Sequence, residues 1–445
     1  MRINEITIRN FRGFASKKFS FDKQLTLIVG NNTAGKTTLL HATRVALGAY
    51  LRSLKQLPND KAYSLNFAMD DVMMKYNASK KDFFKAEETT RIDVDADMEL
   101  TTMKGGVLST KTLSGVKWFR EMKGNQTPHS RECAGELMDI VDEMEHLRET
   151  KDEGTNAVYP LVLSFGVNRI DNQYRAAKKT KARESNIAKA YKSALRDTVD
   201  FQGAFDWLYR FDMNLKRDKA YKGTDSAFIK ALTTAIPAMT DVIVNSKDNE
   251  FMAKVAVDGM EPEYQTFDHM SDGFKSMICI VAEIAHRCIE LNGFLGEKAV
   301  VMTPGVVIID ELDLYLHPRW QRHVLKDLCA AFPMIQFVVT SHSPFVIQSV
   351  KKQNLIALDG TKDTKDPVYR SIEEIVLSEM NMNTPRSAQY QLMVEQAEQF
   401  YQMVKRGDGD SEAAKKIDEK LRLMEEEFSD NPSYVALLRA ERNSR

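Results

Sequence analysis

Residues 25 to 38 read LTLIVGNNTAGKTT, an apolar run that passes directly into a glycine-rich loop. The run Leu25–Val29 predicts a buried strand, and the loop fits the pattern G-x-x-x-x-G-K-T, which cradles polyphosphates with its backbone N–H groups. Lys36 would reach the outer phosphates, and Thr37 would ligate magnesium. Apolar residues at helical spacing then predict a helix that begins near Gly35 and directs its positive dipole end toward the phosphate. The alternative is a glycine turn that matches the pattern by chance.

A second block, VVIIDE at residues 306 to 311, supports the first. Its β-branched run is typical of a central strand of a parallel sheet, and its two carboxylates follow at the strand end where such sheets bind ligands. This is the Walker B pattern. Asp310 would hold magnesium through water, and Glu311 would orient or deprotonate the attacking water. Alone, the block would also fit a core strand that ends in a solvated acidic pair.

Two further motifs flank this block: Ser271, Asp272 and Gly273 open a predicted helix before it, and His342 follows the next predicted strand after it. The order of the four motifs resembles the ABC-type ATPases. That resemblance implies ATP and Mg²⁺ as cofactors and a head-to-head dimer, in which Ser271 and Gly273 of one chain cap the γ-phosphate bound by the other. It also implies that His342 senses this phosphate. Without the resemblance, Ser271 is a helix N-cap and His342 a loop histidine.

The particular residues in these motifs narrow the resemblance to a smaller group of ATPases. MSDGFKS at 270–276, DELDLYLHPRW at 310–320 and the turn SHSP at 341–344 are similar to those of RecF/SMC-like "AAA" ATPases. Within that group they most resemble the Septu-type, PtuA-like and retron-associated phage-defence ATPases, which are related to the OLD family but lack its TOPRIM domain. The segment ITIRNFRGF at 6–14 fits the same group and makes Arg12 a candidate phosphate contact; otherwise Arg12 is a surface arginine. The implied ATP contacts are Arg12, Asn31, Asn32, Thr33, Ala34, Gly35, Lys36, Thr37, Thr38, Ser271 and Gly273, with Glu311 and His342 catalytic and Thr37 and Asp310 at the metal.

The resemblance implies an α/β fold, an ABC-type ATPase head with mixed parallel and antiparallel sheets. A long interval separates Lys36 from Asp310, so we expect the head to be split by an insertion. Alternating apolar residues at 91–100 and a short strand at 116–122 predict an antiparallel meander. The predicted parts are the N-terminal half of the head at 1–170, a helical insertion at 171–262, the C-terminal half of the head at 263–370, and a helical tail at 371–445 for oligomer or partner contacts.

Composition constrains the class of protein. The 445 residues are 43% apolar and 28% charged with a formal net charge of −1, and no run of apolar residues has the length of a membrane span. The N-terminus reads directly into a strand, without the pattern of a signal peptide. We therefore expect a cytoplasmic protein.

The most basic stretch lies between residues 174 and 196, with eight basic residues against one acidic residue. Such a stretch either follows a nucleic-acid backbone or is a solvated helix face. The candidate nucleic-acid contacts in it are Arg175, Lys178, Lys179, Lys181 and Arg183. The family's glutamine loop has no clear counterpart, and Asn168, Arg169 and Gln173 are its positional candidates.

Two functions follow from the resemblance. The first is an ATP-binding and ATP-hydrolysing regulator in a phage-defence complex, an oligomer whose nucleotide-dependent dimerisation controls a partner HNH-type nuclease. The alternative is an autonomous DNA-repair or recombination ATPase of the RecF/SMC type. An OLD-type nuclease is not expected, because the D-x-D at Asp408–Asp410 lies in a predicted loop and not at a strand end.

Overall fold

The computed structural model divides into two compact units, residues 1–381 and 382–445. The division falls later in the chain than the boundary predicted at 370/371, because helix α11 (Ile372–Ser378) packs on α10 (Pro344–Gln348) of the first unit. None of the described helices is both long and apolar enough to cross a lipid bilayer. The structure describes residues 1–77, 79, 81–85, 88–123, 126–149, 156–167, 185–196, 223–245, 250–256, 261–360, 365–382, 384, 387–409 and 411–427.

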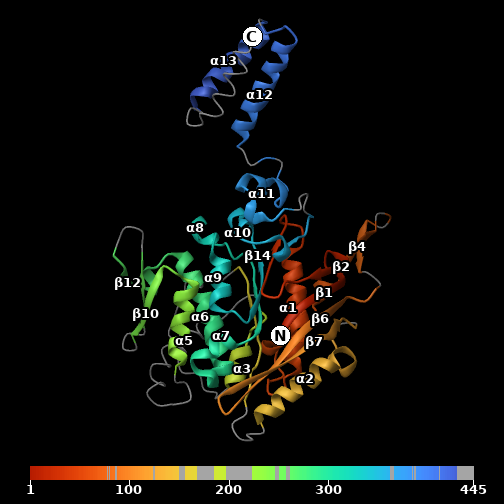
Figure 1. Ribbon diagram of the computed structural model, residues 1–445. Coiled ribbons are helices and arrows are strands. Elements are labelled where there is room, and N and C mark those ends of the chain that lie inside the picture. Colours follow the sequence, from red (N-terminus) through yellow and green to blue (C-terminus); the bar gives the residue numbers. More distant parts are fainter. Residues whose placement is uncertain are drawn as a thin grey trace. The chain divides into compact units, whose positions relative to one another are not determined.

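A five-stranded parallel sheet forms the centre of the first unit (Figure 1). Its strands are nearly all apolar, because helices and a second sheet cover its two faces. The strands predicted next to the nucleotide motifs, at 25–29, 306–309 and 335–340, all belong to it, which confirms the α/β class. In spatial order the sheet runs β15 (Leu355–Ala357), β3 (Leu25–Val29), β14 (Ile335–Thr340), β13 (Gly305–Ile309) and β9 (Leu161–Phe165).

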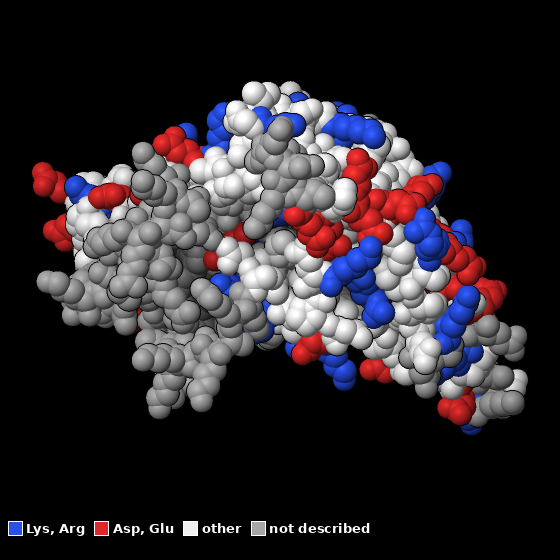
Figure 2. All heavy atoms as spheres, turned by 90° about the horizontal axis from the view of Figure 1, so that it is seen from below, with Lys and Arg blue, Asp and Glu red and all other residues white. Residues whose placement is uncertain are grey.

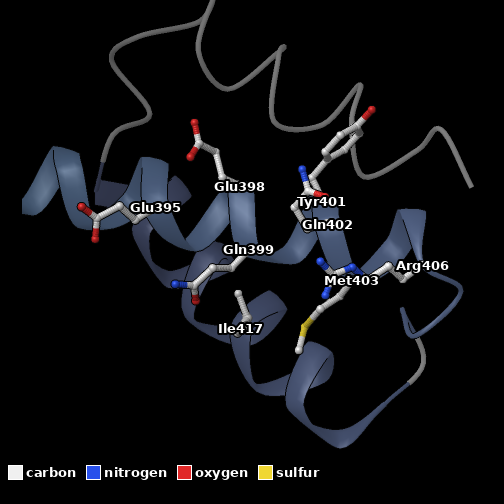
Figure 3. A pocket seen from close by; sticks show the side chains of 8 residues that line it. All are labelled: Glu395, Glu398, Gln399, Tyr401, Gln402, Met403, Arg406 and Ile417. Atoms are coloured by element: carbon white, nitrogen blue, oxygen red, sulfur yellow. The ribbon is translucent and has the colours of Figure 1, made fainter.

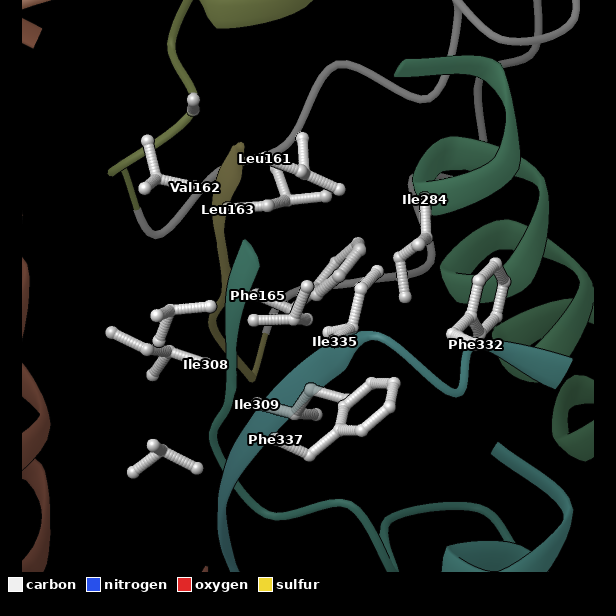
Figure 4. Close-up of a cluster of buried hydrophobic side chains, with 14 of the residues drawn as sticks. Leu161, Val162, Leu163, Phe165, Ile284, Ile308, Ile309, Phe332, Ile335 and Phe337 are labelled. Atoms are coloured by element: carbon white, nitrogen blue, oxygen red, sulfur yellow. The ribbon is translucent and has the colours of Figure 1, made fainter. Parts of the chain in front are cut away.

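Helices pack on the parallel sheet through many buried apolar side chains. Figure 4 shows Ile284 of one helix and Phe332 beside the side chains of Phe165, Ile309 and Phe337 from three strands. These residues are all almost inaccessible to water, so their burial is the main source of stability here. The helices of this layer are α3 (Asn186–Tyr191), α5 (Thr224–Ala235), α6 (Asp272–Asn292), α7 (Ala299–Met302), α8 (Pro318–Gln321) and α9 (Val324–Ala331), whereas α1 (Lys36–Ser53) packs against the antiparallel sheet.

An antiparallel sheet lies beside the parallel one, as the alternating pattern at 91–100 predicted. Ile92, Val94 and Ala96 are buried while their neighbours are half-exposed. The second strand of its main hairpin is much longer than the predicted 116–122, because the pairing continues to a turn at Gly105 and Gly106. The sheet comprises β2 (Phe14–Ser20), β1 (Arg2–Phe11), β6 (Arg91–Lys104) and β7 (Val107–Glu121), with β8 (Asn156–Ala157) on β6 and α2 (Arg131–Glu149) packed on β7.

One buried side chain joins the two sheets. Gln336, on β14, is inaccessible to water, and its Oε1 accepts a hydrogen bond of 2.8 Å from the N–H of Ile3. Its Nε2 donates to the carbonyl of Ile3 at 2.8 Å and to that of Asp22 at 2.7 Å. A buried amide with all these partners satisfied fixes the position of one sheet relative to the other.

The segment 171–262 is not helical throughout, contrary to the prediction. It contains two strands of a three-stranded antiparallel sheet, in which Phe251, Ala253 and Val255 are buried at every second position. This period of two is a strand pattern, and it was missed in a stretch otherwise rich in helix formers. The strands are β10 (Met239–Asn245), β11 (Glu250–Val255) and β12 (Glu263–Thr266).

In its described residues the second unit has two helices, α12 (Ala388–Lys405) and α13 (Glu412–Glu427). Phe400 and Leu421 are the large members of its small core. Residues of α12, together with Arg406 and Ile417, line a cavity of about 830 Å³. Figure 3 shows their side chains. Asp408 lies in the connection between the two helices, as the sequence predicted.

Candidate nucleotide site

The phosphate-binding loop connects β3 to α1, in the strand, loop and helix order that its function requires. Gly35 has φ of 97°, a left-handed conformation, and a Cβ placed on it would lie 2.8 Å from Cζ of Phe14. Glycine can adopt this φ and leaves the space beside Phe14 free, because it has no Cβ. The helix begins at Lys36, as predicted, so its first N–H groups point into the loop.

Lys36 folds back over this loop. Its Nζ donates to the carbonyl of Gly30 at 2.6 Å and to that of Asn31 at 3.0 Å. Burial lowers the pKa of Lys36, and the charges of Asp310, Asp359 and Glu311 oppose that shift. A polyphosphate would give the ammonium strong anionic partners. Of the other predicted loop contacts, Asn31, Asn32, Thr33 and Thr37 are exposed, and Ala34 and Thr38 are half-buried.

The acidic pair lies directly opposite the loop. Asp310 follows the last residue of β13, and the hydroxyl of Thr37 is 3.5 Å from its Oδ2. A threonine hydroxyl beside a carboxylate is the donor set that the magnesium of P-loop proteins uses, so these two residues fit that ion. The predicted metal pair is thus brought together in space from distant parts of the sequence.

Thr340, which the sequence did not indicate, holds both members of the acidic pair. Its hydroxyl donates to Oδ1 of Asp310 and accepts the N–H of Glu311 at 2.8 Å. Glu311 has φ of 47°, which is uncommon for a residue with a side chain and costs about 1–3 kcal/mol. The buried threonine on the neighbouring strand therefore holds the backbone of Glu311, the predicted water-orienting residue, in a strained conformation.

His342 lies at the same edge of the sheet. The strands β3, β14 and β13 are parallel neighbours, so the loop, His342 and the acidic pair all follow their carboxyl ends. The N–H of His342 donates to Oδ1 of Asp313 at 3.3 Å. This contact connects the predicted phosphate sensor to the Walker B segment.

The S-x-G motif packs against the Walker B segment of its own chain. Ser271 is the N-cap residue of α6 but its hydroxyl makes no capping hydrogen bond, so capping does not account for it. A Cβ on Gly273 would lie only 2.6 Å from the carbonyl oxygen of Tyr315. Next to it, the rings of Phe274 and Trp320 meet edge to face at 4.3 Å. These contacts explain why MSDGFKS and DELDLYLHPRW occur together.

Arg12 is held by an ion pair. Its Nε lies 2.8 Å from Oδ1 of Asp71, a fully buried carboxylate that His41 of α1 also contacts at 3.0 Å. Burial opposes ionisation of Asp71, but the hydrogen bonds from His41 and from the N–H of Ala68, with the charge of Arg12, lower its pKa. The phosphate contact of Arg12 stays a prediction, and the structure adds Asp71 and His41 as its neighbours.

Asp359 also contacts the loop without any indication in the sequence. Its Oδ2 accepts the N–H of Asn31 at 2.6 Å. In contrast, the basic residues Arg175, Lys178, Lys179, Lys181 and Arg183 and the glutamine-loop candidates Asn168, Arg169 and Gln173 lie outside the described residues.

A phosphate-binding loop after one parallel strand and an Asp–Glu pair after a near neighbour define a P-loop nucleotide-binding domain. The family comparison agrees. A model described as "AAA domain" matches residues 5–227, half of the chain, and one described as "AAA domain, putative AbiEii toxin, Type IV TA system" matches residues 184–348. The chain belongs to the AAA-domain family, as its motifs predicted.

Curated relatives span most of the chain. It is 22% identical to the retron Vc95 probable ATPase of Vibrio cholerae, over 94% of this chain and 86% of that protein. It is 23% identical to the retron Ec83 probable ATPase of Escherichia coli, over 82% and 73%. A shorter match, 32% identical over 140 residues, is to the Septu protein PtuA of Bacillus thuringiensis and covers 28% of this chain and 34% of that one.

Solved structures are more distant. The SMC head domain from Thermotoga maritima is 14% identical and aligns with 79% of this chain and 92% of its own, with a TM-score of 0.36.

Proposed function

We propose that this chain is the ATP-binding and ATP-hydrolysing regulator of a phage-defence system, and that it controls a separate HNH-type nuclease through nucleotide-dependent dimerisation. The observation that carries the ATPase part is the convergence of Lys36, Thr37, Asp310 and Glu311 at one edge of the sheet. The retron and Septu relatives support the defence role.

In the proposed mechanism each residue of the site has a separate role in phosphoryl transfer. Lys36 and the loop amides would neutralise the outer phosphates, and Thr37 with Asp310 would hold Mg²⁺, which would supply positive charge against that of the phosphates. Glu311 orients the attacking water and accepts its proton. The strained backbone of Glu311 and its tether to Thr340 keep the carboxylate in place before ATP arrives.

The proposed dimer places Ser271 and Gly273 of one head over the γ-phosphate held by the other. A helix N-terminus with a hydroxyl is an anion site that needs no cation. The edge-to-face pair of Phe274 and Trp320 keeps the start of α6 fixed to the Walker B segment. Any movement of α6 on closure of the dimer would therefore be transmitted to Asp310 and Glu311 of the same chain, the chain that supplies the cap.

The nucleotide site is tested with two substitutions. Lys36→Ala removes the ammonium that pairs with the phosphates and should abolish ATP binding in a calorimetric titration. Glu311→Gln should bind ATP normally but lose turnover, because the amide cannot accept the proton of water. Unchanged ATP affinity in Lys36→Ala, or wild-type turnover in Glu311→Gln, would contradict the assignment.

The composite site is tested by mixing inactive chains. Lys36→Ala lacks the binding half and Ser271→Arg blocks the capping half, so a hybrid dimer retains one intact site. Mixtures should regain part of the wild-type turnover while each variant alone stays inactive. Mixtures as inactive as their parents, although hybrids form in a tagged pull-down, would exclude the head-to-head arrangement.

The partner is tested by co-expression with an HNH-type nuclease, should one be encoded beside the gene. We expect the nuclease to co-purify through the second unit, 382–445, which exposes Leu392, Tyr401 and Leu423. If a chain that ends at residue 381 still retained the nuclease, the contact would lie in the first unit instead. The alternative, an autonomous DNA-repair ATPase, depends on the basic residues at 175–183, which lie outside the described part of the chain.

A further inference from the structure

A small hairpin lies at the edge of the first unit (Figure 1), and its aromatic side chains are exposed. It consists of β4 (Met74–Asn77) and β5 (Asp82–Lys85). Tyr76 is 56% exposed and Phe83 61%, and their rings pair across the strands with centroids 5.1 Å apart. Isolated apolar side chains on a surface are ordinary, but a paired set on one ribbon indicates a binding surface.

Both faces of this ribbon are open. Tyr76 and Phe83 are cross-strand partners on one face, and Lys75 and Phe84 are partners on the other. All four side chains are exposed, so the apolar groups are buried against neither the sheet nor a helix. A two-stranded ribbon alone is barely stable in water, so its apolar side chains do little for the fold.

The charge of the hairpin points to a polyanion. Residues 74–85 include four lysines and one aspartate, in a chain whose net charge is −1. Lysine is depleted in the cores of protein–protein interfaces, whereas lysines interleaved with aromatic rings are typical of surfaces that bind nucleic-acid strands. By contrast, the face in Figure 2 carries acidic and basic side chains side by side.

The base of the hairpin is fixed to the nucleotide half of the molecule. The N–H of Met73 donates to the carbonyl of Asn10 at 3.1 Å, and the N–H of Arg12 donates to the carbonyl of Asp71 at 2.8 Å. Through its side chain Asp71 also pairs with Arg12 and with His41 of α1. The exposed tip is therefore held on a rigid, partly ionic base, as a recognition element requires.

We propose that the β4–β5 hairpin binds single-stranded nucleic acid, with bases stacked on Tyr76 and Phe83 and phosphates paired with Lys85, which lies on the same face, and with Lys81 at the turn. The single strand is favoured over the duplex because the paired rings offer a stacking platform, and the bases of a duplex already stack on one another. This inference is independent of the proposed control of a nuclease, since it rests on the hairpin alone.

The test is fluorescence anisotropy of the full-length protein with a labelled oligothymidine strand and with a labelled duplex. Tyr76→Ala with Phe83→Ala should weaken binding of the single strand by about five- to a hundredfold. Lys81→Glu with Lys85→Glu should weaken it as well and reduce the slope of log affinity against log salt by about 0.7 for each phosphate that the variant no longer neutralises. Wild-type protein should prefer the single strand to the duplex.

Two controls match these changes. Tyr369→Ala removes an aromatic ring that is 85% exposed elsewhere, and Lys111→Glu reverses an exposed charge on β7. Both should leave affinity for the strand within about twofold, and all variants should keep ATP binding, which shows that they fold. Equal affinity in the hairpin variants, or no binding of the strand by the wild type, would overturn the proposal. So would loss of self-association or nuclease capture with strand affinity unchanged, which would make the hairpin a protein contact.

Discussion

Replacing Thr340 by valine tests whether the site depends on the bridge that its hydroxyl makes between the carboxylate of Asp310 and the backbone N–H of Glu311. Valine has nearly the same shape but can neither donate to Asp310 nor accept the N–H of Glu311. A hydrogen bond to a charged group contributes about 1.5–3 kcal/mol, and one to a buried amide about 0.5–1.5 kcal/mol. If about 1.4–2.7 kcal/mol of this loss appears in the transition state, turnover falls about 10- to 100-fold.

The assay is ATP turnover at saturating ATP, with affinity measured separately by calorimetry. Thr340→Ser keeps the hydroxyl and should retain turnover within a few-fold. Thr26→Val alters a buried threonine on β3 whose hydroxyl accepts from the N–H of Asp22, away from the carboxyl edge, and should lose only stability. Equal turnover in Thr340→Val and Thr340→Ser would show that Asp310 and Glu311 keep their geometry without the bridge, and the reasoning would fail.

Two further predictions concern stability. Gln336→Leu leaves the N–H and carbonyl of Ile3 without their partner and should lower the free energy of unfolding by about 2–5 kcal/mol in urea titrations, whereas Gln24→Leu, at a half-exposed site, should cost below about 1 kcal/mol. Burial, then the charges of Arg120 and Arg52, lowers the pKa of His129 to about 4. The unfolded chain therefore binds the extra proton first, so stability should fall as pH drops from about 6.5 to about 4, and His129→Gln should flatten that slope. An unchanged urea midpoint in Gln336→Leu, or an unchanged slope in His129→Gln, would contradict these arguments.

The sequence predicted those parts of the site that are written in contiguous residues. The loop at 30–38 and the pair Asp310–Glu311 each follow an apolar run, so a local pattern contains both the strand and the chemistry. The long hairpin of β6 and β7 was only partly predicted, because exposed residues near its turn lack the alternation of its buried end. The strands β10 and β11 were missed where short alternation was embedded among helix formers.

The groups that position the site could not be predicted, because each acts across a long separation in sequence. Thr340 meets Glu311 only because β14 and β13 are neighbours, and Asp359 meets Asn31 only because β15 lies beside β3. A threonine at a strand end and an aspartate in a loop are ordinary residues until the strand order is known. The packing of Phe274 on Trp320 likewise needs the fold.

The place of β3 in the sheet also bears on how the chain is made. Its two hydrogen-bonded neighbours are β14 and β15, which begin at residues 335 and 355, although β3 itself ends at residue 29. During synthesis from the N-terminus, the antiparallel ladder of β1, β2, β6 and β7 can form early, while β3 waits with both edges unpaired. An apolar strand in that state is prone to pair with another chain. A chain whose synthesis stops before residue 335 would thus be an aggregation-prone fragment, and rapid completion of the C-terminal quarter protects the very strand that carries the phosphate-binding loop.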